Sequence, residues 1–212
     1  MKTLIIGGSG FVGTHLLDSI GIKNIINYDK RDSKSYSRIT VVGNILDKVK
    51  LKKVLKDIET VILLAAEHKD NVSPKQLYYD VNVTGTKNVL EAMNENDVRK
   101  IIFTSTVAVY GLNKINLNED STIDPFNDYG KSKAEAEKAI TNWQKKGEDR
   151  KAIIIKGVLE KCNGNQRFSL SQTRFLADLP RSLVARGGAL WRTQGLNISE
   201  KSINTKSKII KI

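Results

Sequence analysis

The feature that most constrains the fold is a turn of glycines that follows a short apolar run at the amino terminus. The apolar run covers residues 3–6, and the turn reads Gly7-Gly-Ser-Gly10-Phe-Val-Gly13. Gly7, Gly10 and Gly13 fit the G-x-x-G-x-x-G pattern, and the related G-x-G-x-x-G pattern is met from Gly8. In such a loop the first glycines let the backbone approach a pyrophosphate, and the last lets a helix pack closely on the strand.

The helix expected after this turn presents its amino terminus to the phosphates. A purely structural turn is the alternative, but the position between a strand and a helix favours a dinucleotide. Asp29 ends the second expected strand, about where a carboxylate binds the ribose hydroxyls. It favours NAD over NADP, although Lys30 and Arg31 follow directly and could soften its repulsion of a 2′-phosphate. The expected loop contacts are Gly7, Gly10, Phe11, Val12 and Gly13.

Apolar periodicity predicts strands that alternate with helices, which indicates an α/β fold with a doubly wound parallel sheet of Rossmann-like type. Pro74 is expected to open one long helix, and a later helix has Ala136, Ile140 and Trp143 on its inner face. The expected strands cover residues 3–6, 24–28, 39–42, 60–65, 100–104 and 152–155, and a short helix is expected over 51–58.

Tyr129-Gly-Lys-Ser-Lys133 lies on that later helix, and its tyrosine and lysine share one helix face. A lysine ammonium beside a phenol should lower the pKa of the phenol, so that it can take a proton from a substrate hydroxyl. Thr106 follows the strand at residues 100–104, where a hydroxyl can hydrogen-bond a substrate oxygen. Ordinary strand-end capping is the alternative for Thr106.

In combination these residues resemble the extended short-chain dehydrogenase/reductase family, specifically its NAD-dependent epimerase/dehydratase branch. The resemblance covers roughly residues 1–155. It is carried by Gly7-Gly-Ser-Gly10-Phe-Val-Gly13, Asp29, Ala65-Ala66, Asn82-Val-Thr-Gly85-Thr, Thr104-Ser105-Thr106-Val-Ala-Val-Tyr110-Gly111 and Tyr129-Gly-Lys-Ser-Lys133.

The resemblance implies roles for individual residues. Tyr129 is the expected acid/base, with Lys133 as its activator and a ribose ligand, and Thr106 matches the family's Ser/Thr near the reacting centre. Asn82 is expected to support this centre. Ala65 and Ala66 are expected to line the cofactor crevice, although core packing explains them equally well. Asn44, before Ile45, stands where the family usually has an aspartate that contacts adenine.

Two departures refine this interpretation. Dehydratases and decarboxylases of the family carry an acidic residue within two positions after the Ser/Thr, where this chain has Val107 and Ala108. Epimerase chemistry on a nucleotide sugar is therefore favoured. After Ile155 the family continues with an Arg-Pro pair and a substrate-binding portion, whereas here the pattern stops. We expect an NAD-binding domain over residues 1–155 and an irregular basic tail over 156–212, as in a truncated or frame-shifted member. A dinucleotide-binding module or remnant without turnover is the alternative.

Charge and composition limit the partners. Of the net charge of +12, residues 151–212 contribute 12 Lys/Arg against 3 Asp/Glu. These charges are dispersed, so nucleic acid is not expected, and a polyanion-binding tail is the weaker idea. The single cysteine, Cys162, fits the cytoplasm, and neither a metal site nor a membrane span is expected. Glu137 reads as part of a charged helix face. The family's usual pairing suggests a homodimer.

Overall fold

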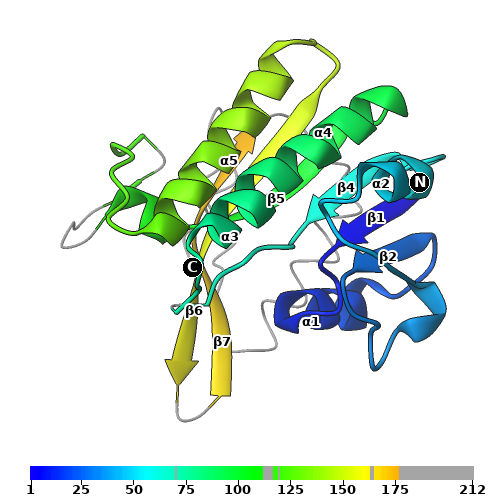
Figure 1. Cartoon of the computed structure of the whole chain (residues 1–212), viewed down its shortest axis with the longest axis horizontal. Helices are drawn as coiled ribbons and strands as arrows, with labels where there is room; N and C mark the ends of the chain where they lie inside the picture. Colours follow the sequence, from blue (N-terminus) through cyan, green and yellow to red (C-terminus); the bar gives the residue numbers. More distant parts are fainter. Residues whose placement is uncertain (70, 112–116, 119, 163–164, 177–212) are drawn as a thin grey trace, which may run out of the picture.

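One mostly parallel sheet organises the chain (Figure 1). A computed structural model describes residues 1–69, 71–111, 117–118, 120–162 and 165–176. Within these residues the strand order is β3-β2-β1-β4-β5-β6-β7. The strands are β1 (Thr3–Ile6), β2 (Ile25–Asp29), β3 (Thr40–Val42), β4 (Thr60–Leu63), β5 (Lys100–Thr106), β6 (Lys151–Cys162) and β7 (Asn165–Leu176).

The pairings among β1 to β6 are parallel, which confirms the predicted doubly wound sheet. The order reverses between β1 and β4, and ligands of such sheets bind at the carboxyl ends of the strands at this point. The glycine turn follows β1 directly and therefore lies at this place. The helices are α1 (Phe11–Ile20), α2 (Lys48–Val54), α3 (Gln76–Tyr79), α4 (Gly85–Glu95) and α5 (Asp128–Lys145), with short turns η1 (Ser37–Ile39), η2 (Asp80–Thr84) and η3 (Val107–Tyr110).

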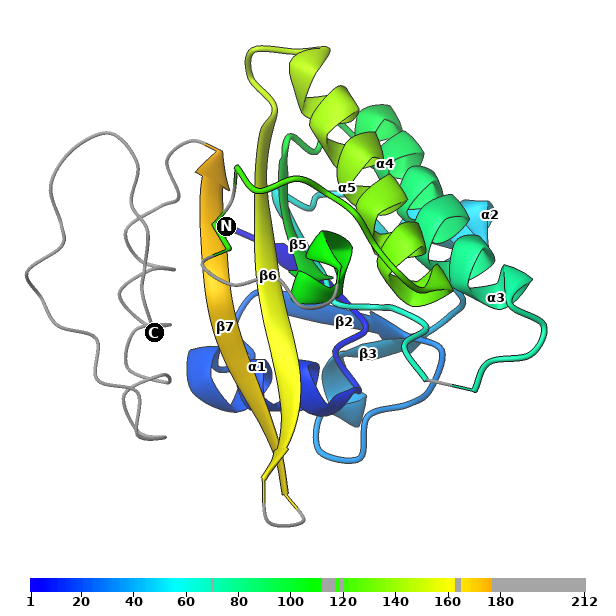
Figure 2. The same ribbon diagram turned by 90° about the vertical axis from the view of Figure 1, so that its left-hand side faces the viewer.

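Alternate residues of the central strand β1 pack into two apolar layers, one on each face of the sheet. Leu4 and Ile6 of β1 belong to a large buried cluster with residues of α2, α4 and α5. Ile5, between them, packs instead with Leu17 of α1 on the other face. Figure 2 shows α2, α4 and α5 gathered on one side of the sheet. Ala136, Ile140 and Trp143 of α5 are buried in the large cluster, as predicted, so the helix presents a fixed face to β5 and β6.

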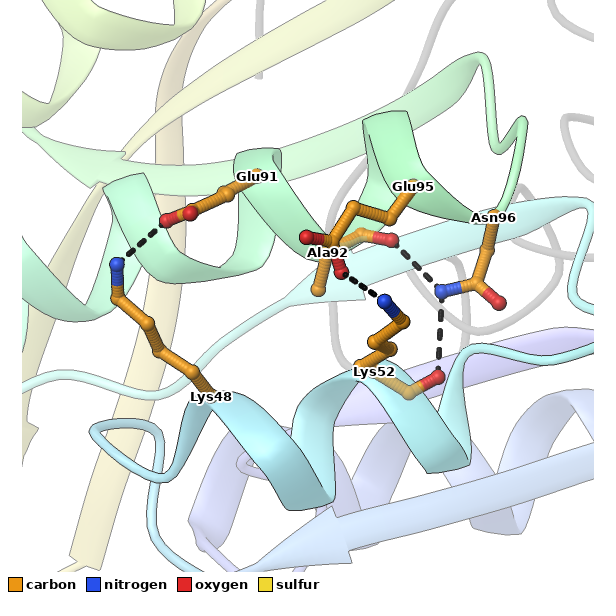
Figure 3. Close-up of polar contacts among 6 residues, drawn as sticks. All are labelled: Lys48, Lys52, Glu91, Ala92, Glu95 and Asn96. Atoms are coloured by element: carbon orange, nitrogen blue, oxygen red, sulfur yellow. Dashed lines mark hydrogen bonds and ion pairs between the residues drawn. The ribbon is translucent and has the colours of Figure 1, made fainter.

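Polar contacts fasten α2 to α4 at the surface (Figure 3). Lys48 Nζ lies 2.6 Å from Glu91 Oε2, and Lys52 Nζ lies 3.3 Å from Glu95 Oε2. Asn96 Nδ2 donates to the Lys52 carbonyl oxygen at 3.2 Å. These ion pairs are exposed, and each therefore contributes at most about 1 kcal/mol.

The strand expected over residues 152–155 is longer in the structure. β6 continues to Cys162 and pairs with β7 in antiparallel register from Ala152↔Leu176 to Cys162↔Asn165. The residues just past 155 therefore continue the strand, with a shift of the β6–β7 register between Lys156 and Gly157. Residues 177–212 of the expected tail lie outside the described residues, and the division of the chain at residue 155 stays a prediction.

The helix expected to run from Pro74 is also divided. α3 is followed by a turn of π-helix, η2, before α4 begins at Gly85. Gly85 faces inward, since a Cβ there would come within 2.8 Å of Ile45 Cγ2. Across the part of the chain that the structure describes, we find no helix with the length and apolarity needed to cross a membrane.

Candidate functional site

The three glycines of the loop have different reasons to be glycine. Gly7 has φ +93°, and a Cβ there would lie 2.4 Å from the backbone nitrogen of Ala65. A Cβ on Gly13 would lie 2.3 Å from Cα of Gly8. On Gly10, by contrast, a Cβ would meet only the Gly7 carbonyl oxygen, at an ordinary 3.4 Å. The fold itself therefore requires Gly7 and Gly13, whereas the missing side chain of Gly10 leaves room outside the loop.

The amino terminus of α1 fits an anion. Gly10 is the N-cap, and among the described residues no side chain caps this helix or places an acidic group in its first turn. The first N–H groups of a helix lack intrahelical partners and carry partial positive charge. Phe11 and Val12 stand in this first turn, Phe11 exposed and Val12 half-buried. The turn thus has both the room and the donors that a pyrophosphate needs.

Asp29 is held beside the loop by backbone donors. Its Oδ2 accepts from the N–H of Ser9 and its Oδ1 from the N–H of Arg31, each at 3.0 Å. These bonds fix the carboxylate at the end of β2, where it is 8% exposed. Each oxygen keeps a further lone pair, so the group suits ribose hydroxyls.

Asn27 is a loop-supporting residue that the sequence analysis missed. Its side chain is fully buried under the glycine turn, and Nδ2 donates to Ser9 Oγ at 3.0 Å. A Cβ on Gly8 would come within 2.3 Å of Asn27 Oδ1, so the absence of a side chain at Gly8 makes room for this amide. The available signal was an asparagine inside an otherwise apolar strand.

Thr106 and Tyr129 meet at the carboxyl end of β5. Asn127 caps α5 by accepting from the N–H of Gly130 at 2.7 Å. A Cβ on Gly130 would lie 2.7 Å from the carbonyl oxygen of Ala108, so the start of α5 presses closely on η3. This approach places Tyr129 near Thr106, whose side chain acts to lower the pKa of the phenol.

The acidity of Tyr129 departs from the expectation. Burial raises the pKa of Tyr129 and the phenol of Tyr78 adds to the rise, while the hydrogen bond with Thr106 acts in the opposite direction. The rings of Tyr78 and Tyr129 lie 6.3 Å apart. The expected lowering by a neighbouring ammonium is therefore wrong for this structure, because desolvation of the phenolate outweighs the groups that favour it.

Lys133 lies one turn further along α5 and is 2% exposed. Its Nζ donates to the carbonyl oxygen of Thr104 at 2.7 Å and lies 3.9 Å from the centroid of the Phe103 ring. Burial lowers the pKa of Lys133 to about 7, and the charge of Glu137 opposes that change. The side chain is therefore poised between its charged and neutral forms near neutral pH.

Asn82 joins two parts of the site. It lies in η2, where its Oδ1 accepts from the N–H of Glu67 at 2.8 Å. Its Nδ2 donates to the Glu67 carbonyl oxygen at 3.0 Å and to Ser132 Oγ at 2.9 Å. Asn82 thus ties the segment after β4 to the residue before Lys133. Single turns of π-helix are frequent at functional sites.

Replacing Asn82 with alanine is expected to lower the free energy of unfolding by about 2–4 kcal/mol, because it leaves the buried N–H and C=O of Glu67 without partners. Urea denaturation measures the change. Asn96→Ala, at the exposed end of α4, is the control and should cost less than about 1 kcal/mol. An equal loss of unfolding free energy in both variants would show that the buried hydrogen bonds between Asn82 and Glu67 do not stabilise the fold more than an exposed one.

The remaining predicted residues also lie at the carboxyl ends of strands. Ala65 and Ala66 follow β4 and are partly exposed, with Ala65 backed by Gly7. Asn44 and Ile45 follow β3; Asn44 accepts at its carbonyl from the Tyr28 hydroxyl at 2.8 Å, and Ile45 is buried. Their contact with a cofactor stays a prediction.

Two charged residues were misread from the sequence. Glu137 is buried on α5 rather than part of a solvated face, and Lys156, assigned to the tail, is a buried residue of β6. The spacing of four between Lys133 and Glu137 was the available signal. Among the described residues no group of three or more His, Cys, Asp or Glu side chains could hold a metal ion.

The strand order, the glycine turn and the carboxylate at the end of β2 define a dinucleotide-binding domain of the Rossmann type. The model of the NAD-dependent epimerase/dehydratase family matches residues 3–194, and the chain belongs to this family. The family is NAD-dependent, and the residues around the loop fit that cofactor.

Two relatives of the chain are named as sugar 4-epimerases. The chain is 54% identical over 155 residues to an N-acetyl-alpha-D-glucosaminyl-diphospho-ditrans,octacis-undecaprenol 4-epimerase of Escherichia coli O157:H7, covering 73% of this chain and 47% of that protein. It is 32% identical to a UDP-glucose 4-epimerase of Lactobacillus helveticus, covering 74% and 51%. The chain thus spans about half the length of the curated relatives it matches.

Solved structures agree with the fold. A short-chain dehydrogenase/reductase superfamily protein from Agrobacterium tumefaciens with bound NAD superposes with a TM-score of 0.68 at 25% identity, over 74% of this chain and 48% of that one. UDP-glucose 4-epimerase from Brucella ovis in complex with NAD gives a TM-score of 0.66 at 26% identity, over 73% and 51%.

Proposed function

We propose that this chain provides the NAD-binding and proton-transfer part of a 4-epimerase that acts on a sugar carried by a diphosphate group. The observation that carries the proposal is the close packing of the start of α5 on η3, which places Tyr129 near Thr106 at the end of β5 with Lys133 buried one turn away. The diphosphate is common to the nucleotide-linked and undecaprenol-linked sugars in the names of the two relatives above.

The proposed cofactor contacts combine the geometry of the glycine loop with the roles that the family resemblance implies. The N–H groups at the start of α1 bind the pyrophosphate, with Gly10 leaving space for it, and Asp29 accepts from the ribose hydroxyls. Asn44 and Ile45 flank the adenine, and Ala65 and Ala66 line the crevice. Lys133 donates to the second ribose.

The proposed chemistry is a reversible oxidation at one sugar carbon. When bound, NAD accepts a hydride from that carbon and later returns it, and its positive nicotinamide ring favours the phenolate of Tyr129. Tyr129 Oη takes the proton of the 4-hydroxyl group as the hydride leaves, which gives a ketone. Thr106 hydrogen-bonds the same sugar oxygen. After the sugar turns over, Tyr129 returns the proton, so nothing is consumed and the configuration is inverted.

The residues after Thr106 support epimerisation over elimination. Val107 and Ala108 occupy the first two positions of η3, and neither side chain can move a proton. Loss of water from the sugar requires an acid or base in addition to the phenol. We therefore expect the carbon skeleton and all hydroxyl groups to be retained.

To test the function, the full chain is incubated with NAD and N-acetylglucosamine on a polyprenyl diphosphate, and the configuration at C4 is followed by proton NMR. We expect the galacto isomer to form. UDP-N-acetylglucosamine serves as the second substrate, and the higher identity to the undecaprenol-linked enzyme favours the lipid carrier. Binding of NAD without inversion of either substrate would instead show a dinucleotide-binding module without turnover.

A further inference from the structure

A buried polar cluster lies between α5 and the carboxyl ends of β5 and β6, next to Lys133. Ser105 and Lys156 are register partners on the two parallel strands, so their side chains stand side by side on one face of the sheet. Glu137 reaches them from α5, and Tyr110 from η3. All four side chains belong to residues that are at most 9% exposed.

The contacts in this cluster place a donor on each oxygen of Glu137. Ser105 Oγ donates to Oε1, and Lys156 Nζ lies 3.3 Å from Oε2. Lys156 Nζ also donates to the hydroxyl of Tyr110 at 2.9 Å and lies 4.2 Å from the centroid of its ring. Lys156 therefore balances the charge of Glu137 inside a region of low dielectric, where unpaired charges are costly.

Glu137 also acts on Lys133, which lies four residues earlier on the same helix. Its negative charge favours the ammonium form of Lys133, against the effect of burial. Lys156 is a second positive charge bound to the same carboxylate, so it weakens that support. Among the described residues, Glu137 is the charged group that acts on Lys133 directly. Lys156 of β6 binds Glu137, and Tyr110 of η3 binds Lys156. Tyr129 lies four residues before Lys133 on α5, and its ring packs against Tyr78 of α3.

We propose that Glu137 and Lys156 are positioning residues that influence the charge of Lys133 in opposite directions. Glu137 favours the ammonium form of Lys133, and Lys156 weakens that effect by binding the same carboxylate. The inference rests on the proposed function for its importance, since only a protonated Lys133 can stabilise the Tyr129 phenolate. The effect of Glu137 and Lys156 on the protonation of Lys133 is a property of the free protein, so it can be measured without NAD or substrate.

The test is a pH titration of Lys133 in the full chain labelled with ¹³C-lysine. Its Nζ-linked carbon is assigned by comparison with Lys133→Met, and the midpoint is followed by NMR. Removing the carboxylate charge in Glu137→Gln should lower the midpoint by roughly 1 pH unit, because burial is then less opposed. Removing the competing charge in Lys156→Met should raise it by a similar amount.

Two matched variants separate charge from packing. Glu135→Gln removes an exposed carboxylate from the same helix and should leave the midpoint unchanged. Lys156→Arg keeps the positive charge and should also leave the midpoint of Lys133 unchanged. A purely structural cluster would lower stability in the Glu137 and Lys156 variants without moving the midpoint in opposite directions.

Shifts of the same sign in the two neutralised variants, or none in either while both are folded, would overturn the proposal. If either fails to fold, Glu137→Asp withdraws the carboxylate by one methylene and should lower the midpoint by a smaller but measurable amount; an unchanged midpoint there also overturns it. NAD affinity by calorimetry is measured alongside. If the midpoint of Lys133 does not shift in opposite directions while NAD binding and epimerisation are intact, only this inference is wrong. If the opposite shifts are seen but the chain does not epimerise the sugar, only the proposed function is wrong.

Discussion

Tyr129→Phe is expected to lower the rate of C4 inversion by about 10²–10⁴-fold, the range that a positioned acid/base contributes. The variant removes the phenol whose pKa Thr106 acts on, yet keeps the ring that packs against Tyr78. The binding constant for NAD should change little, because the loop contacts at α1 and Asp29 are untouched. Rates are measured from product NMR, and affinity is measured by calorimetry.

Tyr79→Phe is the matched control for this loss. Tyr79 also reaches the start of α5, where its hydroxyl donates to Asp128 Oδ1 at 3.2 Å. Its removal deletes a hydroxyl near the site without touching Thr106, so inversion should stay near the wild-type rate. Full activity in Tyr129→Phe, or an equal loss in Tyr79→Phe, would remove Tyr129 from the mechanism.

The sequence was sufficient to predict the parts of the site that depend on local order. The glycine turn, Asp29 and the position of Thr106 all follow from where a strand ends, and parallel strands bring such ends together. Tyr129 and Thr106 are 23 positions apart in the chain, but Thr106 ends β5 and Tyr129 lies in the first turn of α5, the next helix along the sheet. Their proximity is thus a consequence of the strand order.

The protonation states could not be predicted in the same way. The sign of the pKa shift of Tyr129 depends on how deeply α5 seats against β5, and spacing along a helix does not report that depth. The same limit applies to Glu137, which has the sequence of a solvated helix residue but lies against Ser105 and Lys156. Burial is a property of the packed layers, so a charged residue on an amphipathic helix is ambiguous until the partner strands are placed.

The extension of β6 and the presence of β7 were missed because neither segment has a clear apolar alternation. An antiparallel edge pair is held by backbone hydrogen bonds, which place weaker demands on side-chain pattern than a buried parallel strand does. A signal was present in the sequence, since Asn163-Gly164 stands between the two strands and this dipeptide is favoured in two-residue hairpins.

Gly10→Ala and Gly13→Ala are expected to separate cofactor binding from folding. In Gly10→Ala the new methyl group meets no close protein atom, so unfolding free energy should fall by less than about 1 kcal/mol, the cost of a weaker N-cap. The methyl group enters the space left for the pyrophosphate. Overpacking of about 1–3 kcal/mol there should weaken NAD binding by roughly 10–100-fold.

In Gly13→Ala the methyl group would lie 2.3 Å from Cα of Gly8, so backbone must move and both stability and NAD affinity should fall. Gly21→Ala is the control for backbone strain alone: its φ is +74°, but nothing lies within 4 Å of the added Cβ. It should cost about 1–3 kcal/mol of stability, because its ψ of 179° puts it in a region that is essentially restricted to glycine, and leave NAD affinity unchanged. Denaturation curves and calorimetry on the three variants decide the matter. If Gly10→Ala bound NAD as tightly as the wild type, the space at Gly10 would not be the seat of the pyrophosphate, because only a ligand gives that position a reason to lack a side chain.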